Sequence, residues 1–205
     1  MKNYKEGEKM QFICCFGQRD NGKDVVSDYL GHKIQSWKRS AFANPVKDIF
    51  CDAFGVDRKF IEQWKRNPEP PPGFQKSIRE CLQYIGDGFR NMKEDVWHER
   101  GLRDKNLIMS DGRYINEAMA SNEKDGFNIV VYRPGYLNND ESRSESEIRS
   151  VVEWCLKNIQ EGFIPEDDSQ EFTKCFHYFL INDGSLEDLY KKIDEKLLPW
   201  LSQLI

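Results

Sequence analysis

The sequence lacks several features that mark specialised classes of protein. Its six cysteines include no Cys-x-x-Cys pair and no spacing typical of a zinc site. A disulfide framework is also unexpected in a chain of 205 residues, so we expect reduced, buried thiols in a cytoplasmic protein. The three histidines show neither the spacing of a catalytic triad nor that of a metal site. We therefore assign the histidines no role and expect neither a zinc site nor a disulfide framework.

Long apolar runs and an excess of basic charge are absent too. No run approaches the roughly 18 apolar residues of a membrane-spanning helix, and the polar first ten residues do not resemble a signal peptide. The 30 Lys and Arg residues stand against 35 Asp and Glu residues, which gives a net charge of −5. We therefore expect no membrane and no nucleic-acid partner, although a few local arginines could hold a small anionic ligand.

What is present is an alternation of short apolar runs with amphipathic segments, which predicts an α/β fold with a largely parallel, five-stranded sheet. The expected strands are 11–16, 34–37, 107–110, 128–132 and 175–181. The expected helices are 22–32, 45–54, 58–65, 75–92, 94–103, 114–121, 148–160 and 186–201. In such sheets ligands bind beyond the carboxyl ends of the strands, which draws attention to the loops there.

The strongest motif is Gly17-Gln-Arg-Asp-Asn-Gly-Lys23-Asp24, which fits the phosphate-binding pattern G-x-x-x-x-G-K between a predicted strand and a predicted helix. The glycines allow a tight turn that aims backbone N–H groups at one point, and the helix adds the positive end of its dipole. Lys23 would supply an ammonium group to the β- and γ-phosphates. The motif therefore predicts phosphate binding.

Asp24 stands where this motif usually has Ser or Thr, whose hydroxyl ligates Mg²⁺. A carboxylate also suits Mg²⁺, but it places negative charge near the β-phosphate. We therefore expect Asp24 to contact the metal through water. Asp111, at the end of a predicted strand, is the second candidate of this kind.

Three further groups of residues are candidates for the site. Asp111 and Arg113 follow a strand, with Glu117 nearby; a plain surface turn with an Asp–Arg pair is the alternative. Arg133 precedes a charged stretch over 134–150 that suits an arginine-bearing lid, or an ordinary exposed loop. On the predicted helix over 75–92, Arg79, Gln83 and Gly86 share a face that suits base recognition or only solvation, and Arg90 lies on the same helix. Lys47, at the start of the predicted helix over 45–54, leaves the same two alternatives open.

The motifs, taken in order, resemble the phage-type deoxynucleoside monophosphate kinases, a branch of the P-loop NMP kinases. The resemblance runs from about residue 11 to 197 and rests on the order of the set, which is Phe16-Gly17…Gly22-Lys23-Asp24, Ser40-Ala-Phe-Ala-Asn-Pro-Val46-Lys47, Arg79-x-x-Leu82-Gln83-x-x-Gly86, Val96-Trp97, Ser110-Asp111-x-Arg113-x-x-x-Glu117, Arg133-Pro-Gly135 and Asn182-Asp-Gly-Ser-Leu186.

The resemblance implies a single domain over 1–205 with a three-layer P-loop NTPase fold, in which about 40–104 form a helical substrate-binding insertion and about 134–150 a lid. It implies the reaction ATP + dNMP → ADP + dNDP with Mg²⁺, in a bacterial or phage-infected host cytoplasm, and it allows a homodimer. The implied ATP-binding residues are Gly17, Asp20, Asn21, Gly22, Lys23, Asp24, Val25, Val26, Ile181, Asn182 and Gly184. The implied dNMP-binding residues are Arg19, Val46, Lys47, Arg79, Gln83, Gly86, Arg90, Trp97, Asp111, Arg113 and Glu117. We expect Lys23, Arg113 and Arg133 to act on the transferred group.

Three features depart from the family pattern, one of which is the short, proline-rich segment between the helix over 45–54 and Arg79. Val25 stands where the family usually has Thr, and the lid reads Ser144-Glu145-Ser146-Glu147 without the usual histidine. Two other functions therefore stay open. One is a P-loop kinase for another small acceptor such as dephospho-CoA, with Asp111 as a base for a hydroxyl acceptor. The other is a nucleotide-binding interaction protein without catalysis.

Overall fold

The computed structural model describes residues 10–136 and 142–203. The chain divides into two compact units. One, the sheet unit, comprises Met1–Ala41 and Leu102–Ile205, and the other, the helical unit, comprises Phe42–Gly101. The two units are described separately below.

The sheet unit is built on a six-stranded sheet with the order β2-β3-β1-β4-β6-β5. Five strands are parallel, and β5 pairs with β6 in the antiparallel sense. The predicted α/β fold with a mostly parallel sheet is confirmed, but the expected count of five strands is wrong by one. The strands are β1 (Phe12–Phe16), β2 (Lys38–Ser40), β3 (Leu107–Gly112), β4 (Gly126–Tyr132), β5 (Gly162–Phe163) and β6 (Tyr178–Ile181).

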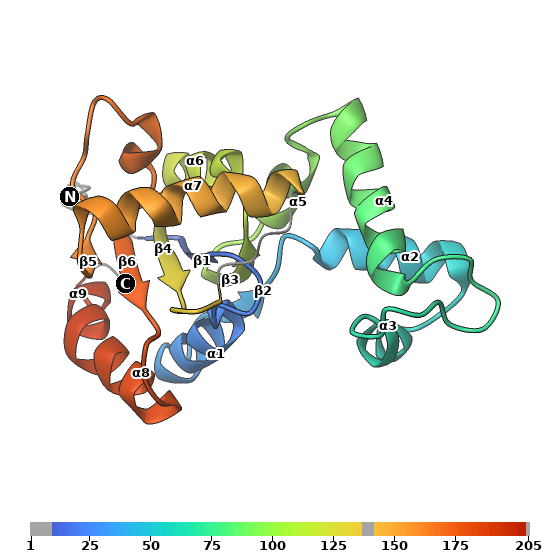
Figure 1. The fold of residues 1–205 in the computed structure, drawn as a ribbon, viewed down its shortest axis with the longest axis horizontal. Helices are drawn as coiled ribbons and strands as arrows, with labels where there is room; N and C mark the ends of the chain where they lie inside the picture. Colours follow the sequence, from blue (N-terminus) through green and yellow to red (C-terminus); the bar gives the residue numbers. More distant parts are fainter. Residues whose placement is uncertain (1–9, 137–141, 204–205) are drawn as a thin grey trace. The chain divides into compact units, whose positions relative to one another are not determined.

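Helices cover both faces of this sheet and make the expected three layers (Figure 1). One face carries α1 (Lys23–Lys33), α8 (Leu186–Lys192), the π-helical turn η2 (Ile193–Leu197) and α9 (Leu198–Leu201). The other face carries α6 (Ile115–Glu123) and α7 (Arg143–Asn158), and the short 3₁₀ helix η1 (Glu171–Lys174) precedes β6. Among the described residues, no helix is long and apolar enough to cross a membrane.

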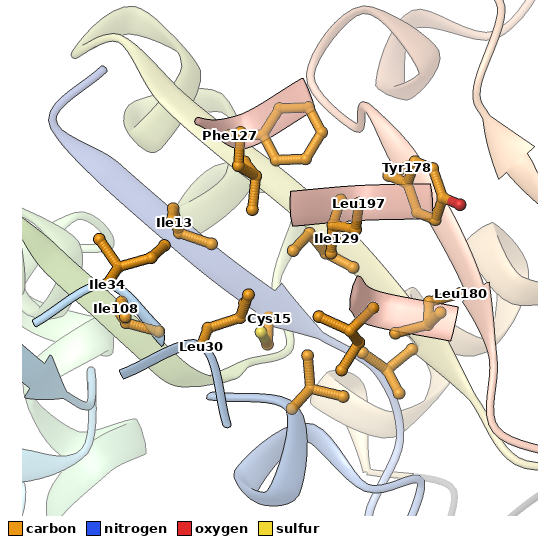
Figure 2. Packing of buried hydrophobic residues seen from close by; sticks show 14 of the residues in the cluster. Ile13, Cys15, Leu30, Ile34, Ile108, Phe127, Ile129, Tyr178, Leu180 and Leu197 are labelled. Carbon is orange, nitrogen blue, oxygen red and sulfur yellow. The ribbon is translucent and has the colours of Figure 1, made fainter. Parts of the chain in front are cut away.

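The central strand β1 is apolar at every position because both faces of the sheet are covered there. In β1, Ile13 and Cys15 face the layer of α1, where Leu30 packs against them (Figure 2). Alternate positions of β4 and β6 join the same cluster, among them Ile129 and Leu180. All five residues of β1 are buried, which explains the uninterrupted apolar run in the sequence.

The helical unit has a small core of its own, formed by Phe50, Ile61 and Ile78. Helix α4 begins with a capping box, in which Ser77 Oγ accepts from the Glu80 N–H at 3.3 Å and the Glu80 carboxylate accepts from the Ser77 N–H at 2.9 Å. These reciprocal bonds satisfy N–H groups that have no partner within the helix. The helices are α2 (Asn44–Phe54), α3 (Arg58–Trp64), α4 (Ile78–Met92) and α5 (Val96–Gly101).

Several elements differ from the sequence-based expectation. Residues 34–37 form a turn, and the strand β2 begins directly after them, at Lys38. Ile34 and Trp37 are apolar because they pack into the core after α1. Helix α7 begins at Arg143 instead of 148, and β6 begins at Tyr178 instead of 175.

All six cysteines carry free thiols. Four of them lie in the sheet unit and are buried: Cys14, Cys15, Cys155 and Cys175. The other two, Cys51 and Cys81, lie in the helical unit and are partly exposed.

Candidate active site

The phosphate-binding motif forms the loop between β1 and α1, and its two glycines are required by the geometry. Gly17 has φ +150° and Gly22 has φ +98°, conformations that other residues rarely adopt. A Cβ at Gly17 would lie 2.3 Å from the Val131 carbonyl oxygen, and one at Gly22 would lie 2.6 Å from Asn182 Nδ2. The loop therefore lies directly against the ends of β4 and β6.

Lys23 is buried at the start of α1, and its ammonium group turns back onto the loop. Its Nζ donates to the carbonyl oxygens of Gly17 and Gln18, each at 2.6 Å. Burial, followed by the positive charge of Arg113, lowers the pKa of Lys23 to about 8, against the opposing effect of nearby carboxylates. Phosphate oxygens could replace the two carbonyl oxygens as acceptors and would stabilise the charged form.

Two asparagines connect the loop to the neighbouring strand ends. Asn21 Oδ1 accepts from the Arg133 N–H at 2.6 Å, just beyond β4. Asn182 donates from Nδ2 to the Asn21 carbonyl at 3.3 Å and from its backbone N–H to the Tyr132 carbonyl at 2.7 Å. Of the residues predicted near the adenine, 181–184, Asn182 therefore contacts the loop.

The other predicted loop residues have their own partners. Arg19 Nε lies 3.2 Å from a carboxylate oxygen of Asp20, and both side chains are exposed. Val25 packs against the main core, and Val26 is fully buried within it. The Val26 N–H donates to the Gly22 carbonyl at 3.0 Å, so it takes part in the first turn of α1.

Asp24 forms an ion pair with Arg39 of β2, a residue that the sequence analysis did not select. The same guanidinium lies 2.8 Å from Asp28 Oδ1 and donates to Ser110 Oγ at 3.4 Å. Arg39 therefore balances the extra carboxylate that this loop carries in place of a hydroxyl. No local signal identifies it, because a lone arginine on a polar edge strand is common.

Two carboxylates at this end of the sheet are candidate ligands for Mg²⁺. Asp24 is largely exposed, and Asp111 lies at the end of β3. Within residues 10–136 and 142–203, no group of three or more His, Cys, Asp or Glu side chains could hold a metal ion. One or two carboxylates fit Mg²⁺ that is bound mainly by nucleotide phosphates and water.

The segment after β3 is held against the loop by its backbone. The Gly17 N–H donates to the Gly112 carbonyl at 3.3 Å. Glu117 Oε2 accepts the N–H groups of Arg113 at 3.0 Å and Tyr114 at 3.2 Å. Glu117 is buried and caps α6, so its observed contacts orient the backbone that carries Arg113.

Glu145, in the first turn of α7, contacts the same segment and was missed by the sequence analysis. Its carboxylate pairs with the Arg113 guanidinium and accepts the Arg19 N–H at 3.1 Å. The side chain is fully buried. Its position in the predicted lid was known, but nothing in the sequence indicated that it reaches the loop.

Arg133 is exposed just after β4, and its guanidinium lies 4.4 Å from the centre of the Tyr136 ring. Of the predicted lid over 134–150, residues 137–141 lie outside the described part of the chain. Residues 143–150 form the first half of α7.

The remaining predicted residues lie on the helices of the helical unit. Lys47 Nζ lies 3.3 Å from Glu62 Oε1, and Arg90 Nη1 lies 3.4 Å from Asp87 Oδ1. The Trp97 indole N–H donates to the Gly86 carbonyl at 2.9 Å. This bond joins α5 to α4. The others are Val46 on α2 and Arg79 and Gln83 on α4.

The structure thus brings the predicted phosphate-handling residues together at the carboxyl ends of the parallel strands. In the sheet unit these are Gly17, Lys23, Asp24, Asp111, Arg113, Arg133 and Asn182. The predicted acceptor-binding residues Val46, Lys47, Arg79, Gln83, Gly86, Arg90 and Trp97 belong to the helical unit. Their roles in binding stay predictions.

No model of a protein family matches the chain. A curated protein from Acanthamoeba polyphaga mimivirus, described as "Putative deoxynucleotide monophosphate kinase", is 28% identical over 183 residues, which cover 78% of this chain and 94% of that protein. Among solved structures, shikimate kinase from Acinetobacter baumannii is 17% identical with a TM-score of 0.48, covering 97% of each chain. Dephospho-CoA kinase from Campylobacter jejuni is 13% identical with a TM-score of 0.43, covering 95% of this chain and 98% of its own.

Both TM-scores are below 0.5, so these two structures do not bear on the substrate. The curated relative agrees with the expectation of a phosphotransferase. The resemblance expected from the motifs is thereby confirmed: over most of its length the chain is similar to a viral protein that carries the name of a deoxynucleotide monophosphate kinase.

Proposed function

We propose that the protein is an ATP-dependent kinase of deoxynucleoside 5′-monophosphates. The observation that carries this proposal is the P-loop with Lys23 folded onto it, together with the backbone bond from Gly17 to Gly112 that brings the segment carrying Arg113 to the loop. Two cations at the carboxyl ends of adjacent parallel strands suit a reaction between phosphate groups. The description of the curated viral relative supports a dNMP as the acceptor.

In the proposed reaction, an oxygen of the dNMP phosphate forms a bond to the γ-phosphorus of ATP. The bond from that phosphorus to the β,γ-bridging oxygen breaks, and its electron pair leaves with ADP. The attacking oxygen is already anionic, so no general base is required. Catalysis then rests on alignment and on neutralising the charge of the transferred group.

The chain's own residues have distinct parts in this scheme. The N–H groups around Gly22 and Lys23 hold the phosphates of ATP, and the Lys23 ammonium exchanges its carbonyl acceptors for phosphate oxygens. Arg113 and Arg133 neutralise charge at the transferred group. Asp24 and Asp111 would hold Mg²⁺ through water, and the ion would supply further positive charge to the phosphates.

We further propose that the helical unit supplies the acceptor site, as the substrate-binding insertion expected over about 40–104. Arg79 and Arg90 on α4 carry guanidinium groups suited to the dNMP phosphate. Gln83 lies between them, and its amide can donate to and accept from a base edge. The proposed localisation is the cytoplasm of a bacterium or of a phage-infected host cell.

The test is ADP release in a coupled assay with ATP, Mg²⁺ and each of dAMP, dGMP, dCMP and dTMP, with Lys23→Ala as the matched inactive control. We expect release that depends on one or two of the dNMPs and is absent in the variant. The four ribonucleotides, dephospho-CoA and shikimate serve as further acceptors. Turnover of a hydroxyl acceptor alone, or ATP binding without any turnover, would contradict the proposal and favour the other-acceptor kinase or the non-catalytic binding protein respectively.

A further inference from the structure

Glu145 is a fully buried carboxylate to which the proposed reaction gives no role. It lies in the first turn of α7, and each of its two oxygens has a partner from another part of the sheet unit. Oε1 pairs with the guanidinium of Arg113, and Oε2 accepts the backbone N–H of Arg19 at 3.1 Å. The side chain therefore bridges the segment after β3 and the P-loop.

The main chain of Glu145 reinforces this position. Gln18 is itself buried in the loop and donates from Nε2 to the Glu145 carbonyl at 3.3 Å. The Glu145 N–H donates to the Ser142 carbonyl at 3.1 Å, which begins α7. A carboxylate in the first turn of a helix is also stabilised by the helix dipole. The residue is thus fixed at both its backbone and its side chain.

The charges around Glu145 are arranged about the proposed phosphate site. Arg113 lowers the pKa of Lys23, whereas Glu145 raises it, so the three charged groups lie within electrostatic reach of one another. Arg113 and Lys23 repel each other, and the buried carboxylate opposes that repulsion. A guanidinium held by a fixed buried partner has less freedom to leave the site than one on an open surface.

We propose that Glu145 is a positioning residue that acts through Arg113, holding its guanidinium beside the P-loop so that the free donor edge receives a phosphate group. The identity of that phosphate as the acceptor's rests on the proposed function. Glu145 itself touches neither substrate. A merely structural ion pair is the alternative, and it predicts that loss of Glu145 lowers the free energy of unfolding but leaves the kcat/KM of the folded protein unchanged.

The test is a double-mutant cycle over Glu145→Gln and Arg113→Met, with kcat/KM measured for the dNMP that the wild type uses best. In the wild type we expect Glu145→Gln to lower kcat/KM by about tenfold or more. In the Arg113→Met background the same change should alter kcat/KM by less than about twofold, because its effect passes through Arg113. Effects that multiply in the double variant would overturn the proposal.

Glu153→Gln is the matched control, since it removes the same charge from an exposed position of the same helix. It should change kcat/KM by less than about twofold in either background, and a loss as large as that of Glu145→Gln would contradict the proposal. Should Arg113→Met fail to fold around the unpaired carboxylate, Arg113→Lys replaces it, because lysine keeps the charge without the planar fork.

A second readout separates this inference from the proposed function. Inorganic diphosphate is titrated into the same four proteins by calorimetry, because it can occupy the P-loop without an acceptor nucleotide. If the wild type turns over none of the dNMPs, the proposed function fails. The double-mutant cycle is then calculated from the dissociation constants of diphosphate instead of from kcat/KM. Non-additive weakening then supports the role of Glu145 through Arg113, and additive or absent weakening overturns it.

Discussion

Lys23 is a buried cation whose ammonium group is hydrogen-bonded to two carbonyl oxygens of its own loop. Replacing it with alanine removes a charge from the proposed transition state, so we expect kcat to fall by about 10²–10³, equivalent to about 3–4 kcal/mol. Lys33→Ala is the control, since that exposed lysine ends the same helix and pairs with Asp194. An unchanged rate in Lys23→Ala would contradict its role.

The lowered pKa of Lys23 predicts how activity depends on pH. Because that pKa is about 8, the ammonium is charged at lower pH, and kcat/KM for ATP should fall as the pH rises above about 8. Burial is the largest cause of the lowered pKa; of the charged groups around Lys23, Arg113 lowers it further, whereas Glu145, Asp111 and Asp24 oppose the shift. A pH–rate profile of the wild type tests this, and a flat profile through pH 9 would contradict it.

The lowered pKa of Lys23 also affects stability: activity should fall as the pH rises, whereas the stability contribution of Lys23 should increase. The pKa of Lys23 falls from 10.5 to about 8 on folding, so between these values the unfolded chain binds more protons than the folded one. The contribution of Lys23 to the free energy of unfolding therefore rises with pH across this window, and its destabilising effect is fully present below pH 8. Thermal unfolding over the same pH range separates loss of activity from loss of the fold.

Individual site residues differed in how far the sequence revealed them. The loop from Gly17 to Lys23 was predictable because its residues are contiguous and each position has a local physical reason. Arg39 and Glu145 were not, because they reach the loop from 15 and 126 positions away and belong to no motif that marks such a contact. Only the folded chain shows that these charges meet.

Among the elements, α4 has the most complete helix cap of the helical unit. Ser77→Ala removes the hydroxyl that accepts the Glu80 N–H, and we expect a loss of about 1 kcal/mol in the free energy of unfolding. Urea denaturation followed by far-UV circular dichroism measures this. Ser77→Thr keeps the accepting oxygen and should retain most of the stability, so an equal loss in both variants would show that the cap is not responsible.

The elements that sequence patterns predicted well are those with a strong period or a continuous apolar run. Strand β1 and helix α1 begin within one residue of their predicted positions. Strand β2 was misplaced because its sequence, Lys-Arg-Ser, is polar and lies at the edge of the sheet. Strand β5 has two residues and pairs only along β6, which is too short a segment to show a pattern.

At the scale of the whole molecule, the two proposed binding functions fall on different units. The phosphate-handling residues lie in the sheet unit, and the residues proposed to bind the acceptor lie in the helical unit. The sequence suggested a helical segment over about 40–104, and the compact helical unit spans Phe42–Gly101. Its own core of Phe50, Ile61 and Ile78 could be expected from helical spacing, whereas its separateness depends on contacts throughout the fold.

The distribution of the cysteines gives each unit a different chemical reactivity. Burial raises the pKa of Cys15 to about 11 and that of Cys155 and Cys175 to about 12, and a neutral buried thiol reacts slowly. Cys51 and Cys81 are the partly exposed thiols. We expect a maleimide added to the native protein to modify these two first, and peptide mass mapping would contradict this by finding early label in the sheet unit. A chain with its natural cysteines can therefore carry a fluorophore on the helical unit alone, so that nucleotide binding at the proposed acceptor site would change the emission while the P-loop stays unlabelled.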